Sequence, residues 1–126
     1  MNKPTKTRVL VVEDEFLVSE IIRDSLTEAG YDVTDRVANG REALEAIRHS
    51  APDIILMDIQ LPDIDGLETA RLINNMKPLP IVVLTAYDTP DLLNRAKNLG
   101  IMAYLIKPPQ PAEIDRALQF ALARFR

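Results

Sequence analysis

The sequence predicts a doubly wound α/β fold, with a five-stranded parallel sheet covered by five helices. Two observations support this prediction. Short apolar segments rich in β-branched residues alternate along the chain with longer segments whose apolar residues recur at helical spacing. Three of the short segments are continuously apolar, which is typical of parallel strands buried on both faces. Strands and helices that alternate in this way form a parallel sheet between two helical layers.

The first half of the chain supplies five predicted elements. A strand at Val9–Val12 precedes an amphipathic helix at Phe16–Ala29. Tyr31–Val37 alternates in polarity like an edge strand, Arg41–Ser50 is the second helix, and Ile54–Met57 is a buried strand. The residues predicted to face the core from the first helix are Val18, Ile21, Ile22, Leu26 and Ala29. The residues predicted to share one side of the edge strand are Tyr31, Val33, Asp35 and Val37.

The second half supplies the other five. A helix at Leu67–Met76 precedes an apolar strand at Ile81–Leu84. The next helix, Pro90–Leu99, begins with a Thr-Pro pair, which is a helix start signal. Ala103–Ile106 is predicted as the fifth strand and Ala112–Phe125 as the last helix, with one apolar stripe. Phe120 falls outside that stripe, so we expect its ring at the surface.

Composition excludes several classes of protein. Fifteen lysines and arginines oppose 19 acidic residues, for a formal net charge of −4, so this domain is not expected to bind nucleic acid directly. The absence of cysteine excludes disulfides and thiolate metal sites. No apolar stretch is long enough for a signal peptide core or a membrane span, which predicts a cytoplasmic protein without membrane contact. The length predicts one domain over residues 1–126, with its core at about 8–125.

Polar residues follow the predicted strands at the points where the strands end. Glu13 and Asp14 follow the first strand, Asp58 the third, Thr85 the fourth and Lys107 the fifth. Functional groups of doubly wound sheets gather at this edge. If the first and third strands are neighbours, three carboxylates converge, and either a raised pKa or a cation must relieve their repulsion. Oxygen ligands without histidine or cysteine favour Mg²⁺.

The same set of side chains fits phosphoryl transfer to a carboxylate. An aspartate can act as a nucleophile and form an aspartyl phosphate. A cation and Lys107 would supply the positive charge that the moving phosphoryl oxygens need, and Thr85 offers a hydroxyl to them. Taken alone, Asp58 is better explained by a purely structural role as a turn or cap residue. The agreement of four strand ends favours a functional site.

Four motifs in this order resemble the receiver domain of two-component response regulators. They are VLVVEDE at 9–15, DIILMDIQLPDIDG at 53–66, VVLTA at 82–86 and AYLIKP at 103–108. The resemblance extends from about residue 8 to residue 125. It implies a flavodoxin-like fold with strand order 2-1-3-4-5. It also implies a sensor histidine kinase or phosphotransfer protein as partner, and a possible homodimer through the last strand and helix.

The resemblance also implies roles for individual residues in the acidic cluster. Asp58 is the expected phospho-acceptor, and Glu13 and Asp14 are the expected acidic pair for Mg²⁺. Asp58 itself and the backbone carbonyl of Gln60 complete the expected ligands.

Three further residues receive roles by the same resemblance. Lys107 is expected to pair with the phosphoryl group and to form a cis peptide bond with Pro108. Thr85 and Tyr104 are expected to be the switch pair, with the hydroxyl moving toward the phosphate while the ring turns inward.

Two other functions stay open. A receiver fold can act as a scaffold without phosphorylation, although such proteins commonly lose the acceptor, an acid or the lysine. A phosphohydrolase with an aspartate nucleophile would carry that aspartate after the first strand, with a second one two residues later, and VVEDE lacks this spacing. We therefore expect a phosphorylated signalling switch rather than an enzyme, with its output domain absent from this chain.

Overall fold

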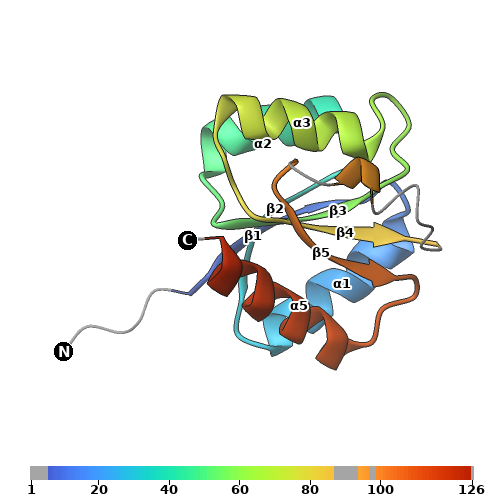
Figure 1. Ribbon diagram of the computed structural model, residues 1–126. Coiled ribbons are helices and arrows are strands. Elements are labelled where there is room, and N and C mark those ends of the chain that lie inside the picture. Colours follow the sequence, from blue (N-terminus) through green and yellow to red (C-terminus); the bar gives the residue numbers. More distant parts are fainter. Residues whose placement is uncertain (1–5, 87–93, 97–98, 126) are drawn as a thin grey trace.

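The protein folds into one five-stranded parallel sheet between two layers of helices (Figure 1). This computed structural model describes residues 6–86, 94–96 and 99–125. The strand order is β2-β1-β3-β4-β5, which confirms the predicted order. The strands are β1 (Arg8–Val12), β2 (Asp32–Val37), β3 (Ile54–Asp58), β4 (Ile81–Thr85) and β5 (Ile101–Ile106).

The helices cover both faces of the sheet, with α1 and α5 on one side and α2 and α3 on the other (Figure 1). Of the predicted helix at 90–99, only residues 94–96 and 99 are described, and 94–96 are helical; its predicted start lies outside the described residues. Within the described ranges, none of the helices combines the length and the apolar composition required to cross a bilayer. The helices are α1 (Phe16–Glu28), α2 (Gly40–Ser50), α3 (Gly66–Met76) and α5 (Pro111–Arg124).

Alternate residues of the central strands pack into opposite layers of the core. In β1, Val9 and Val11 contact the layer of α1 and α5, whereas Leu10 and Val12 contact the layer of α2 and α3. The strands β3 and β4 alternate in the same way. Burial on both faces explains why these segments are continuously apolar and why the first polar side chains occur at the strand ends.

The prediction for the edge strand is wrong in its pattern of faces. In the pairing with β1, Val33 and Asp35 oppose consecutive residues, so Thr34 is an extra residue that forms a bulge. Val33 therefore packs on the α1–α5 side of the sheet and Val37 on the α2–α3 side. A one-residue insertion reverses every following side chain, because the period of a strand is two.

The prediction for the core face of α1 is also partly wrong. Ile22 and Leu26 are buried, but Ile21 is 60% exposed and Ala29 is exposed as well. Ser19 occupies the core position one turn before Ile22. Successive residues are rotated by roughly 100° about a helix axis, so Ile21 is turned toward solvent when Ile22 points into the core.

Candidate functional site

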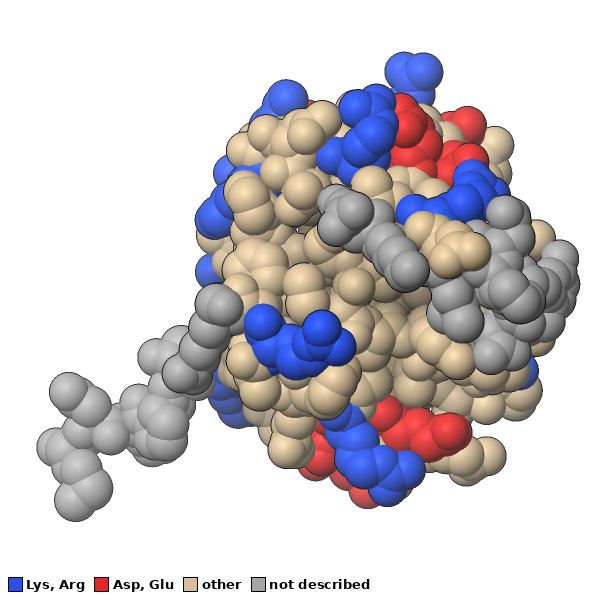
Figure 2. Space-filling view, in the orientation of Figure 1, with Lys and Arg blue, Asp and Glu red and all other residues tan. Residues whose placement is uncertain are grey.

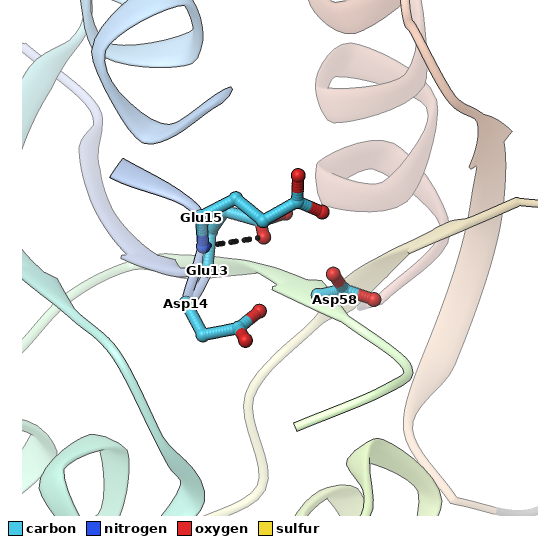
Figure 3. A group of neighbouring side chains, drawn as sticks. All are labelled: Glu13, Asp14, Glu15 and Asp58. Atoms are coloured by element: carbon cyan, nitrogen blue, oxygen red, sulfur yellow. Dashed lines mark hydrogen bonds between the residues drawn. The ribbon is translucent and has the colours of Figure 1, made fainter. Parts of the chain in front are cut away.

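Four carboxylates meet at the carboxyl edge of the sheet (Figure 3). Glu13, Asp14 and Glu15 come from the end of β1, and Asp58 is the last residue of the adjacent β3. One oxygen of each side chain lies within 4.8 Å of the others. Glu13 and Asp58 are buried, at 3% and 4% exposure, whereas Asp14 and Glu15 are exposed.

Lys107 provides the positive charge in this cluster. It follows β5, and its ammonium pairs with the carboxylate of Asp58. The same Nζ lies 3.0 Å from Glu13 Oε1 and 3.5 Å from Glu15 Oε1. Burial alone would lower the pKa of Lys107, but its hydrogen bond to Asp58 and its proximity to Glu13 outweigh that effect and raise this pKa. The lysine is therefore charged at neutral pH.

Glu13 is buried near the carboxylate of Asp58, and its surroundings disfavour the charged form of its own carboxyl group. Burial is the main reason that its pKa rises to about 7, and the nearby charge of Asp58 adds to the rise. A hydrogen bond from the backbone N–H of Glu15 to Oε2, at 3.1 Å, and the ammonium of Lys107 act in the opposite direction. Glu13 therefore holds a proton more tightly than a free carboxyl group does.

The residues present fit a hard divalent cation. Glu13 Oε1 is buried, and the Lys107 ammonium lies 3.0 Å from it. Four carboxylates lie in this cluster beside the Lys107 ammonium, so a further positive charge would offset their remaining repulsion. All donors in the cluster are oxygens, which suit Mg²⁺ rather than a metal that prefers nitrogen or sulfur. Glu13, Asp14 and Asp58 could supply carboxylate ligands.

The loop after β3 forms one wall of the pocket. The backbone N–H of Gln60 donates to Asp58 Oδ1 at 2.9 Å, which fixes the Asp58 carboxylate relative to the loop. A cavity of about 320 Å³ opens here, and its lining includes Asp14, Asp58, Gln60, Pro62 and Lys107. The site therefore places buried carboxylates in the wall of an open cavity.

Thr85 and Tyr104 lie on the same face of the sheet. Tyr104 opposes Val83 and Ile106 opposes Thr85 in the parallel pairing of β4 and β5. Thr85 is buried at 3% exposure, whereas the side chain of Tyr104 is 39% exposed. The backbone N–H of Lys107 donates to the carbonyl of Thr85 at 2.8 Å, which joins this edge to the acidic cluster.

Some features of the site match expectation and others were not anticipated. The peptide bond between Lys107 and Pro108 is cis, as predicted. Sequence reasoning placed three carboxylates in the pocket and missed Glu15, whose signal was the run of three acids at 13–15. It also missed Asp63, which joins the loop after β3 to α2. No local pattern could have revealed that contact, because it spans 23 residues of sequence.

The fold and the pocket define a class: a doubly wound α/β protein with an acidic pocket at the carboxyl edge of its sheet. Comparison with known proteins narrows this class. Residues 9–119 match the response regulator receiver domain. The chain therefore belongs to the receiver domain family of response regulators.

Individual relatives agree with this assignment. The transcriptional regulatory protein PdtaR of Mycobacterium tuberculosis is 40% identical over 119 residues, which cover 94% of this chain but only 58% of PdtaR. The chemotaxis protein CheY of Thermotoga maritima is 34% identical over 112 residues, covering 88% of this chain and 93% of CheY. The signal receiver domain of a modulated diguanylate cyclase from Desulfovibrio desulfuricans superposes with a TM-score of 0.87 at 34% identity, covering 96% and 97% of the two chains.

Proposed function

We propose that this chain is a phosphorylation-driven switch in which Asp58 accepts a phosphoryl group. The observation that carries the proposal is the buried Asp58 carboxylate paired with Lys107 beside the acids at the end of β1. A sensor histidine kinase or phosphotransfer protein is the proposed donor, acting in the cytoplasm. The protein is proposed to turn over no separate substrate.

The proposed reaction is a phosphoryl transfer to a carboxylate oxygen. An oxygen of Asp58 forms a bond to phosphorus while the phosphorus–nitrogen bond of the donor phosphohistidine breaks; the leaving imidazole nitrogen keeps the electron pair and takes a proton. Lys107 then shares its charge with the phosphoryl oxygens. When bound, Mg²⁺ supplies positive charge that offsets the repulsion between the incoming phosphate and the carboxylates. Glu13, Asp14, Asp58 and the backbone carbonyl of Gln60 are the proposed ligands.

Thr85 and Tyr104 are the proposed switch pair. Their position on one face of β4 and β5 supports this, since a movement of the Thr85 side chain toward the phosphate changes the space beside that face. The Tyr104 side chain, which is 39% exposed, would then move to a more buried position. A phosphoryl group biases such an equilibrium only through contacts that differ between the two arrangements.

The surface of the protein gives evidence about partners other than the phosphoryl donor. Figure 2 shows basic side chains separated by uncharged and acidic ones, so the described residues on the visible face form no continuous basic surface for nucleic acid. Exposed apolar side chains on β5 and α5, namely Tyr104, Ile106 and Phe120, support self-association through the last strand and helix. The name of PdtaR supports an output in transcription, which would require a further domain or a partner.

The experiment is intact mass after incubation with acetyl phosphate, with and without Mg²⁺. We expect a gain of one phosphoryl group that depends on Mg²⁺ and is lost in Asp58→Asn. A matched control is Asp24→Asn, because Asp24 is an exposed acid on α1, outside the pocket. An adduct that persists in Asp58→Asn would contradict the assignment. Absence of an adduct with both acetyl phosphate and a purified kinase would favour an unphosphorylated scaffold. Turnover of phosphomonoesters would favour a phosphohydrolase.

A further inference from the structure

The loop between β3 and α3, residues 59–65, includes Gln60 and is held in two places, at its base and at Asp63. At its base, the N–H of Gly66 donates to the carbonyl of Ile59 at 2.7 Å. A Cβ atom at Gly66 would lie 2.6 Å from Ile59 Cα and 2.7 Å from the carbonyl oxygen of Asp58, so only glycine permits this approach. The first turn of α3 therefore closes directly onto the end of β3.

Asp63 fastens the far part of the loop to another helix. Its carboxylate accepts hydrogen bonds from the backbone N–H groups of Gly40 and Arg41, at 2.8 and 3.0 Å, at the start of α2. Burial would raise the pKa of Asp63, but these hydrogen bonds outweigh it and lower the pKa. The carboxylate is thus charged at neutral pH, which favours its place at a helix N-terminus.

This contact differs from an ordinary helix cap. Asn39 already caps α2 from within its own segment, through a 2.9 Å hydrogen bond from the N–H of Glu42 to its side-chain oxygen. Asp63 adds a second acceptor from a loop 23 residues away. The start of α2 also packs closely on this loop, since a Cβ atom at Gly40 would lie 3.2 Å from Ile64 Cβ. Helix α2 thereby acts as a fixed support for the loop.

We propose that Asp63 is a positioning residue that holds the Gln60 backbone at the acidic pocket and so sets the affinity for the divalent cation. The inference rests on the proposed function, because it assumes that Mg²⁺ binds beside Asp58. Asp63 contacts neither the phosphoryl group nor the cation. It acts by limiting the movement of residues 59–65 between the closure at Gly66 and the contact with α2.

The test compares Asp63→Ala with Asn39→Ala. Each variant removes one acceptor side chain from the start of α2, and only the first releases the loop. Amide hydrogen exchange of the metal-free protein should show faster exchange at Gln60 in Asp63→Ala alone. Calorimetric titration with Mg²⁺ should show an affinity weakened by about tenfold, as for other residues that orient metal ligands. Asp63→Asn keeps one acceptor oxygen and should lie between the wild type and Asp63→Ala.

Two results would overturn the proposal. One is an Mg²⁺ affinity of Asp63→Ala equal to that of the wild type, and the other is an equal loss in Asn39→Ala. A wild type that binds no Mg²⁺ would instead contradict the proposed function. Hydrogen exchange at Gln60 would then decide the positioning role without any metal.

Discussion

Replacement of Glu13 by glutamine should change how the stability of the metal-free protein depends on pH. Glu13 is buried beside Asp58, and burial is the main cause of its raised pKa of about 7, compared with an ordinary value of 4.5. Glutamine has nearly the same shape and cannot titrate between these values. The variant therefore isolates the proton that the native pocket holds.

The sign follows from linkage between folding and protonation. The pKa of Glu13 is higher in the folded than in the unfolded chain, so the folded state binds the proton more tightly. The resulting stabilisation is complete below the unfolded pKa and is lost as the pH rises through about 7. Between about pH 5.5 and about pH 8, the free energy of unfolding should fall by about 2 kcal/mol on account of this one group.

The assay is urea denaturation in the presence of a chelator at both pH values, for the wild type and for Glu13→Gln. The wild type should lose about 2 kcal/mol more than the variant on going to the higher pH. Asp24→Asn, an exposed acid, serves as the control and should behave like the wild type. An equal pH dependence in the wild type and in Glu13→Gln would refute the reasoning.

Three other substitutions test individual contacts of the fold by urea denaturation. Lys107→Met leaves the buried Asp58 carboxylate without its ion pair and should lower the free energy of unfolding by on the order of 3 kcal/mol near neutral pH in metal-free protein. A smaller loss in the presence of Mg²⁺ would support cation binding, and no loss in metal-free protein would contradict the role of the ion pair. Gly66→Ala brings a methyl group against the backbone of Ile59 and should cost about 2 kcal/mol; an unchanged midpoint would show that the loop can yield. Tyr31→Phe removes a 2.6 Å hydrogen bond from its hydroxyl to α5 and should cost about 1 kcal/mol; a neutral effect would show that water replaces the bond.

The parts of the fold that sequence reasoning predicted correctly are those governed by burial. Val9–Val12 and Ile81–Leu84 are apolar throughout because both faces of their strands are covered. The same reasoning located the carboxyl edge, since the first polar residue after a buried strand must lie where the helical layers end. Asp58 and Thr85 proved to be the last residues of their strands rather than the first residues of loops.

The features that sequence reasoning did not predict depend on contacts between distant segments. The bulge at Thr34 exists only in the pairing of β2 with β1, and it changes the face of Val37 without any change in the hydrophobic pattern. The exposure of Ile21 depends on how α1 is rotated about its axis where it packs on the sheet. The apolar residues of α1 are compatible with more than one such rotation, so the sequence does not determine it. Asp63 lies in the polar segment after Asp58 in sequence, and only the fold brings its side chain to the start of α2.

Lys107 links the acidic pocket to the face of β4 and β5 that carries the proposed switch pair. Its ammonium is shared among three carboxylates, of which Asp58 is paired most closely. A phosphoryl group on Asp58 would compete for that ammonium and change its position, because the phosphoryl oxygens carry more negative charge than the carboxylate they replace. The backbone N–H of Lys107 is hydrogen-bonded to the carbonyl of Thr85, on the face that also carries Tyr104. A shift of Lys107 would therefore act on the ends of β4 and β5, where its backbone contacts Thr85. In this way a change of charge in the pocket could alter the exposed surface of β5.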